Sequence, residues 1–405
     1  MTKPSASTGA RKPPSQPAGS PLAAHVARAA GNRREFFARS TMALGSTVAL
    51  GGSAVVAAGE AAVADPRANR IGVHAGGSDR IRIGLIGCGA RGKAAAVEAI
   101  AAGSDATNDA SAASGVELVA MADTQSNQLQ TAYRTIRGRQ RHGVEVAGRR
   151  FIGPDGWRGV LASDVDLVIL ATPPEFRALH FENAVEAGKH VFMECPIASD
   201  AAGVQRIAQA GVRARSAGLA VAVGHQRRHE LRTRQCVERL RGGMLGELTY
   251  ARTFGGDLHD DRQVHRLDIV NWVLDQTPRA ARGFGGVNED NVPYHLVEYT
   301  YETDFPLISQ YRKHRGGRQH GEYFHGTLGS CDMAHGSIRD RSGKVIWRSE
   351  AKEIRGKGWQ RQFNELIASL RAGEKPWQLD QAIASTNAVL LGQAAIQSGQ
   401  RTRQL

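Results

Sequence analysis

A glycine-rich turn between a predicted strand and a predicted helix constrains this 405-residue chain most strongly. An alternating apolar segment from Ile81 to Leu85 leads into Gly87-Cys88-Gly89-Ala90-Arg91-Gly92, and Lys93–Ile100 is helical in pattern. In such a unit the first glycine permits a tight turn, the second lets a pyrophosphate approach the backbone, and the third lets the helix pack closely. The free N–H groups of the helix N-terminus then face the phosphates. The nucleotide contacts predicted from this turn are Gly87, Gly89, Arg91 and Gly92.

A second apolar strand, 116–122, ends in Asp123. A carboxylate at this point accepts hydrogen bonds from the ribose hydroxyls of an adenine nucleotide and repels a 2′-phosphate. We therefore predict NAD as the cofactor, with NADP less favoured. The alternative for Asp123 is a helix N-cap or an ordinary loop acid.

Two further strands end in polar or proline-rich segments. The continuous apolar run 166–171 precedes Thr172, Pro173 and Pro174, and the strand 190–193 precedes Glu194 and Cys195. Strands that alternate with helices predict a doubly wound parallel sheet, which binds its ligand at the carboxyl ends of the strands. Thr172, Pro173, Pro174 and Glu194 are therefore predicted to line the nucleotide site.

The N-terminal 64 residues have the pattern of an export signal. Arg33-Arg34 precedes two phenylalanines, an uncharged run follows from Thr41 to Gly59, and Ala62-Val63-Ala64 provides a cleavage site. The twin arginines predict the twin-arginine (Tat) route, and hence a periplasmic or otherwise extracytoplasmic protein. The alternative is a basic tail with a chance Arg-Arg pair.

The net charge of +13 does not by itself indicate a nucleic-acid partner. Residues 1–64 contain seven basic and two acidic residues, so the rest of the chain has a net charge of only +8. The remaining basic runs lack the pattern of a nucleic-acid-binding motif, and no segment is apolar enough over about 18 residues to span a membrane. The cysteines and histidines show no spacing typical of a metal site, so no metal is predicted.

Three segments together resemble the Gfo/Idh/MocA oxidoreductases. They are 84–92, the Ala171-Thr-Pro-Pro174 segment and Ala187-Gly-Lys-His-Val-Phe-Met-Glu-Cys-Pro196. The resemblance extends from about residue 80 to the C-terminus. It implies an NAD(P)-dependent enzyme for sugars, inositols or related polyols. It also implies a Rossmann domain, 80–196, and a C-terminal α/β domain, 197–405, whose open and mostly antiparallel sheet often forms an oligomer interface.

The resemblance also implies where the chemistry lies. The family uses a Lys in an E-K-P motif, an Asp, and a His four residues after it. Asp261 and His265 keep that spacing, so His265 is the predicted base, Asp261 its orienting partner, and Asp268 a further acid that caps or polarises the same helix. The alternative is that Asp261 and His265 only brace a helix start. Gln226 and Arg227 fall where the family's substrate-facing residues lie, although a solvated turn explains them equally well.

Cys195 occupies the position of the family's lysine. A thiol is uncharged at neutral pH when unperturbed, so it does not steer a sugar oxygen as an ammonium group does. Cys195 is interpreted either as an adapted catalytic acid or nucleophile, or as a small buried residue in a degenerate site. The predicted function is therefore an exported oxidoreductase, and the alternative is a non-catalytic nucleotide- or sugar-binding relative.

Overall fold

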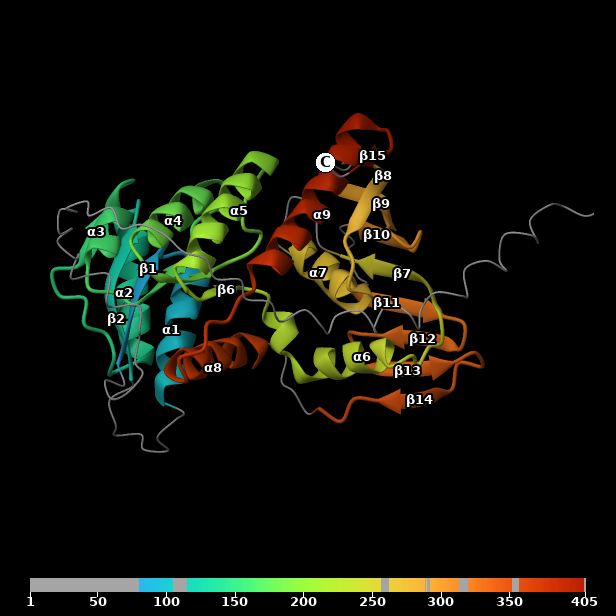
Figure 1. Ribbon diagram of the computed structural model, residues 1–405, viewed down its shortest axis with the longest axis horizontal. Helices are drawn as coiled ribbons and strands as arrows, with labels where there is room; N and C mark the ends of the chain where they lie inside the picture. Colours follow the sequence, from blue (N-terminus) through green and yellow to red (C-terminus); the bar gives the residue numbers. More distant parts are fainter. Residues whose placement is uncertain are drawn as a thin grey trace, which may run out of the picture. The chain divides into compact units, whose positions relative to one another are not determined.

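The computed structural model describes residues 80–104, 115–255, 262–287, 289, 292–312, 320–351 and 357–403. The predicted export signal and the predicted orienting residue Asp261 lie outside these described residues. The described part contains two sheets, which Figure 1 shows with the helices that pack on them.

The first sheet is parallel, and its strand order is β3-β2-β1-β4-β5-β6. Its order and pairing confirm the predicted doubly wound α/β topology. The strands are β1 (Ile81–Ile86), β2 (Val116–Asp123), β3 (Arg150–Ile152), β4 (Leu167–Leu170), β5 (His190–Met193) and β6 (Val221–Val223). The helices that alternate with them are α1 (Ala90–Ser104), α2 (Ser126–Arg139), α3 (Gly156–Ala162), α4 (Pro174–Glu186) and α5 (Ala201–Ser216).

Both faces of this sheet are covered by helices. Every residue of β4 and β5 is buried, as expected for apolar runs in a parallel sheet with helices on both sides. Pro174 is the first residue of α4, where its missing N–H costs no hydrogen bond. Strand ends and helix starts therefore meet along one edge of the sheet.

The second sheet is mostly antiparallel, as predicted, with the order β14-β13-β12-β11-β7-β10-β9-β8-β15. Among the described strand pairs of this second sheet, only β7 and β10 are parallel. The strands are β7 (Leu248–Phe254), β8 (Pro278–Val287), β9 (Pro293–Tyr301), β10 (Pro306–Arg312), β11 (Gly321–Gly326), β12 (Gly329–Asp332), β13 (Ser337–Asp340), β14 (Val345–Arg348) and β15 (Thr402–Arg403). The associated helices are the 3₁₀ helix η5 (Gln226–His229), α6 (Leu231–Arg241), α7 (Arg262–Leu274), α8 (Lys357–Arg371) and α9 (Leu379–Ser398).

The two faces of the second sheet differ. In β9 the side chains of Val297, Tyr299 and Tyr301 are fully buried, and α9 packs against β8 and β9 on that side. On the opposite face Phe284 is 61% exposed and Tyr294 38% exposed. Such alternation between a buried and an exposed face is typical of an antiparallel sheet.

The predicted domain boundary after residue 196 does not coincide with the end of the parallel sheet. Strand β6 pairs with β5, so the sheet continues to Val223. This strand has only three residues, which are too few to show an apolar periodicity in the sequence. In addition, α8 packs against α1, and Phe363 and Ile367 of α8 belong to the core of the first sheet. The C-terminal part of the chain thus completes the core of the first sheet.

Candidate active site

The glycines of the turn after β1 serve two different purposes. Gly87 has φ of +95°, and a Cβ there would lie 2.7 Å from the carbonyl carbon of Ala171. A Cβ on Gly92 would lie 1.9 Å from the carbonyl oxygen of Gly87. Internal packing therefore requires both glycines. A Cβ on Gly89, in contrast, would meet nothing within 4 Å, and Gly89 lines an open cavity.

That cavity, of about 650 Å³, extends along the carboxyl ends of the parallel strands to the first elements of the C-terminal part. Its volume is typical of a site for a small molecule or cofactor. Predicted site residues that line it are Gly87, Gly89, Arg91, Asp123, Thr172, Pro173, Pro174, Glu194, Cys195, Gln226 and His265. Gly92 lies just behind this lining and supports the turn.

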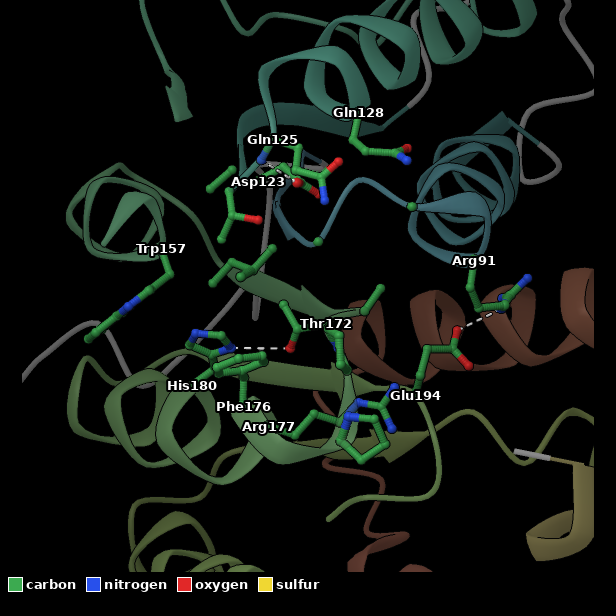
Figure 2. A pocket seen from close by; sticks show the side chains of 18 of the residues that line it. Arg91, Asp123, Gln125, Gln128, Trp157, Thr172, Phe176, Arg177, His180 and Glu194 are labelled. Carbon is green, nitrogen blue, oxygen red and sulfur yellow. Dashed lines mark hydrogen bonds and ion pairs between the residues drawn. The ribbon is translucent and has the colours of Figure 1, made fainter. Parts of the chain in front are cut away.

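Asp123 ends β2 on one side of the cavity, near Gln125 and Gln128 (Figure 2). Its Oδ2 accepts a hydrogen bond of 2.7 Å from the backbone N–H of Cys88, and its Oδ1 accepts one of 2.8 Å from that of Gln125. These bonds fix the carboxylate while leaving each oxygen capacity for another donor. The arrangement fits the predicted contact with ribose hydroxyls.

An aromatic wall faces the phosphate turn across the cavity, and the sequence did not indicate it. Trp157, Phe176 and His180 lie on α3 and α4, and Figure 2 shows the two α4 side chains beside Thr172. Nδ1 of His180 is 3.2 Å from Oγ1 of Thr172, and the ring centroids of Trp157 and His180 are 5.6 Å apart. Burial lowers the pKa of His180 to about 4, so its ring is neutral near pH 7.

Arg91 and Glu194 line the cavity as an ion pair rather than as independent groups. Nε of Arg91 donates to Glu194 at 2.8 Å, and an Nη atom donates to Glu98 at 3.0 Å (Figure 2 shows the first bond). Burial raises the pKa of Glu194, and the charge of Arg91 partly offsets that effect. The guanidinium also lies 5.2 Å from the ring centre of Trp359 on α8, which lines the cavity.

The structure brings the predicted catalytic residues Cys195 and His265 together. Sγ of Cys195 lies 3.8 Å from Nδ1 and 3.9 Å from Nε2 of His265, and Gln226 lines the same part of the cavity. Burial, and then the neighbouring His225, lower the pKa of His265 to about 3. The ring is therefore neutral near pH 7, in the form that accepts a proton.

Arg227 and Asp268 make contacts that the sequence did not predict. Arg227 is absent from the cavity lining formed by the described residues, and its guanidinium donates to the buried carboxylate of Glu322. Asp268 lies in the middle of α7, so the prediction that it caps the helix is wrong. Its carboxylate accepts two hydrogen bonds from Arg228, of 2.8 and 2.9 Å.

Within the residues that the structure describes, no three His, Cys, Asp or Glu side chains are grouped as a metal site would require. No helix in those same ranges combines the length and apolar character needed to cross a membrane.

Comparison with known proteins agrees with this geometry. Residues 81–225 match the family model GFO_IDH_MocA, described as an oxidoreductase family with an NAD-binding Rossmann fold. The chain is 25% identical over 241 residues to D-glucoside 3-dehydrogenase of Escherichia coli, covering 57% of this chain and 62% of that protein. It is 28% identical over 219 residues to inositol 2-dehydrogenase of Acidothermus cellulolyticus, covering 51% and 57%. The chain thus aligns with less than two thirds of each relative.

The fold extends beyond these alignments. The crystal structure of scyllo-inositol dehydrogenase from Lactobacillus casei, with bound NAD(H) and scyllo-inositol, superposes with a TM-score of 0.62. The superposition covers 80% of this chain and 99% of that one, at 19% identity. At this identity the likeness concerns the fold of both halves.

The parallel sheet, the glycine turn and the cavity define an NAD-binding Rossmann fold. More specifically, residues 81–225 match the Gfo/Idh/MocA family model, and a mostly antiparallel sheet follows them in the chain.

Proposed function

We propose that this protein oxidises or reduces a sugar, polyol or glycoside by hydride transfer to or from tightly bound NAD. The observation that carries the proposal is one cavity that is lined both by predicted nucleotide-binding residues and by predicted catalytic and substrate-binding residues. Gly89 and Asp123 lie at its nucleotide end, and Cys195, Gln226 and His265 lie together where the C-terminal part begins. The names of the relatives, a glucoside dehydrogenase and an inositol dehydrogenase, support this substrate class.

The residues of the cavity fit NAD. The open space beside Gly89 leaves room for a pyrophosphate at the start of α1, and the fixed carboxylate of Asp123 suits ribose hydroxyls. Thr172, Pro173 and Pro174 would contact the nucleotide at the adjacent strand end, as would the Arg91–Glu194 pair. The bound nicotinamide supplies the hydride acceptor or donor.

The chain itself would supply the proton transfer. Neutral His265 takes the hydroxyl proton as the alcohol becomes a carbonyl, and it returns the proton in the reverse direction. Cys195 contacts this ring and takes the place of the family's lysine beside the substrate. Gln226 orients a substrate hydroxyl, and Asp261 orients His265.

A non-catalytic nucleotide- or sugar-binding protein is the second candidate, favoured by Cys195 at the lysine position. The variant Cys195→Lys discriminates between the two when it is assayed with a panel of sugars and polyols. Loss of an existing activity identifies an adapted thiol. Activity that appears only in the variant identifies a degenerate site.

The nucleotide itself tests the proposal. We expect the purified protein, once denatured, to release NAD or NADH in near-stoichiometric amount and little NADP. Release of no nucleotide, together with no binding of added NAD, would contradict the proposal. Release of NADP would contradict the assigned role of Asp123.

We further propose export by the Tat route to an extracytoplasmic location. The support is the order of Arg33-Arg34, the uncharged run and Ala62-Val63-Ala64. A tightly bound nucleotide suits this route, because the route carries folded proteins. Replacing both arginines by lysine is expected to retain the protein in the cytoplasm with its N-terminal segment uncleaved. Cell fractionation measures the location, and the mass of the protein shows whether the segment has been removed. Normal export of that variant would refute the Tat assignment.

Self-association through the second sheet is the last part of the proposal. Its uncovered face carries Phe284, Tyr294 and Leu296 next to the cross-strand charge pair of Arg282 and Glu298. A face with apolar and opposite charged groups is self-complementary in a two-fold arrangement. A second copy of this chain is the occupant that we propose.

A further inference from the structure

A buried carboxylate joins the two segments that carry Gln226 and His265 to the cavity. Glu322 lies on β11, and its side chain is 0% exposed. Its Oε1 accepts a hydrogen bond from Nη1 of Arg227 and another, of 2.8 Å, from Nη1 of Arg266. Arg227 directly follows Gln226, and Arg266 directly follows His265. One oxygen atom thus connects the neighbours of two cavity-lining residues.

We propose that Glu322 is a positioning residue, which fixes Gln226 and His265 relative to each other and thereby aligns substrate with base. This inference rests on the proposed function. Glu322 is absent from the cavity lining formed by the described residues, so it acts through Arg227 and Arg266. Its role is distinct from that of the groups that would contact substrate or nucleotide.

The carboxylate is ionised, which the bridge requires. Burial favours the neutral acid, but Arg227 and Arg266 outweigh it, and the pKa of Glu322 is lowered. Arg227 also lies 3.8 Å from Oε2 of Glu230 at the end of η5. Without the charge on Glu322, no shared anion would offset the repulsion between the two guanidinium groups.

A second link between the same elements makes displacement, rather than unfolding, the expected result of breaking the first. Arg228 donates two hydrogen bonds to Asp268, which holds η5 on α7 independently of Glu322. His225 Nδ1 is 3.5 Å from Asp268, and its Nε2 is 3.2 Å from Oγ of Ser385 on α9. Loss of Glu322 would therefore free the cavity end of η5 while its other attachments remain.

The thiol of Cys195 reports on this region without any knowledge of the substrate. It lies 3.8 Å from His265, and the described charged or titratable groups that act on the pKa of His265 include His225, Asp268, Arg227 and Arg266. Removing the negative charge of Glu322 leaves the two arginines uncompensated, which favours the thiolate. The pH at which Cys195 becomes reactive should then fall.

The experiment compares wild type with Glu322→Gln, which keeps the shape and removes the charge. Cys195 is labelled with iodoacetamide at a series of pH values, and peptide mass spectrometry measures the extent of labelling. The nucleotide content of each protein is measured, as are kcat and KM for any sugar or polyol that it turns over. We expect unchanged nucleotide content, kcat about ten- to a hundredfold lower, and a labelling midpoint lower by about half a pH unit or more. Wild-type kcat and labelling in this variant would overturn the proposal.

Two further variants separate positioning from other effects. Glu182→Gln removes a carboxylate that binds Arg206 on the surface of α4, away from the cavity, and should change neither readout. Glu322→Gln combined with Arg266→Gln restores the charge balance but not the bridge. We expect its labelling midpoint to return towards the wild-type value while kcat stays low. Full recovery of kcat would show that Glu322 acts by charge alone and would overturn the positioning role.

The labelling results stand whether or not the proposed function holds. If wild type holds no nucleotide and turns over no polyol, the proposed function fails. The midpoint shift in Glu322→Gln and its reversal in the double variant still show whether Glu322 controls this wall of the cavity. An unchanged midpoint in a protein that is active with polyols rejects the inference about Glu322 and leaves the proposed function intact.

Discussion

At the scale of single residues, the glycines of the turn after β1 have different roles: Gly92 is required for packing, and Gly89 leaves space for a ligand. The space beside Gly89 is open, whereas a Cβ on Gly92 would lie 1.9 Å from a backbone oxygen. We expect Gly89→Ala to keep wild-type stability but lose most nucleotide affinity, because its methyl group projects into the pyrophosphate space. Gly92→Ala should lose about 1–3 kcal/mol of unfolding free energy. Urea unfolding and NAD titration of both variants test the contrast, and equal stability losses would contradict it.

The protonation of His265 sets the expected pH dependence of the reaction. A base is active in its neutral form, and burial lowers the pKa of this ring to about 3. The acidic side of the profile of kcat/KM should therefore stay flat down to about pH 5, because an ordinary histidine titrates near ~6.5 and His265 does not. A fall in kcat/KM centred near that ordinary value would show that His265 is not the buried base described above. The measurement is a pH–rate profile of the wild-type protein.

The residues that the sequence failed to predict act through three-dimensional contacts. Glu322 and Trp359 lie far along the chain from the motifs that they support, and no local pattern marks them. Arg227 was expected at the substrate because of the family resemblance, but its buried partner Glu322 lies 95 residues later in the chain. The nucleotide residues were predictable because their spacing reflects the local geometry of one strand–turn–helix unit.

At the scale of elements, the apolar runs 81–85, 116–122, 166–171 and 190–193 predicted the strands β1, β2, β4 and β5 of the parallel sheet. Strands β4 and β5 were predictable although they are short, because each is a continuous apolar run that ends in a polar or proline-rich segment. The sequence did not reveal strand β6, because three residues are too few to show an apolar periodicity. The packing of α8 on α1 was also missed, since tertiary contacts between distant segments leave no periodic trace in the sequence.

The exposed side chains on one face of the second sheet lead to a prediction about self-association of the protein. Phe284 is 61% exposed on β8 and pairs across the strands with Leu296. We expect Phe284→Glu to raise the dissociation constant of the oligomer at least about tenfold, because it places a charge in an apolar interface. Light scattering during gel filtration measures the mass. Val212→Glu on α5, where the valine is 69% exposed, is the matched control and should leave the mass unchanged.

At the scale of the whole molecule, buried neutral histidines link folding to pH. The pKa values of His180, His190 and His225 are lowered to about 4 by burial, and that of His265 to about 3. Between these values and ~6.5 the unfolded chain binds protons that the folded chain does not, so the unfolding free energy falls as the pH falls. The raised pKa of Glu194 acts in the opposite direction, at pH values from its ordinary pKa of about 4.5 upwards.

The resulting prediction concerns stability rather than activity. Each of the four rings contributes up to about 1.4 kcal/mol per pH unit, so the unfolding free energy should drop by several kcal/mol between about pH 7 and pH 5. Urea unfolding at a series of pH values measures this change. A free energy that is constant over the range would contradict the neutral, buried state of these side chains.

The most direct test of the central claim is the redox state of the bound nucleotide. Purified wild-type protein and His265→Asn are each mixed with a panel of sugars, polyols and glycosides, and the absorbance of reduced nicotinamide is followed in a single turnover. The account predicts that at least one compound changes the redox state of the nucleotide in wild type, and does so much more slowly in the variant. A wild-type protein that holds NAD whose redox state no compound changes, or a variant that reacts at the wild-type rate, would contradict it.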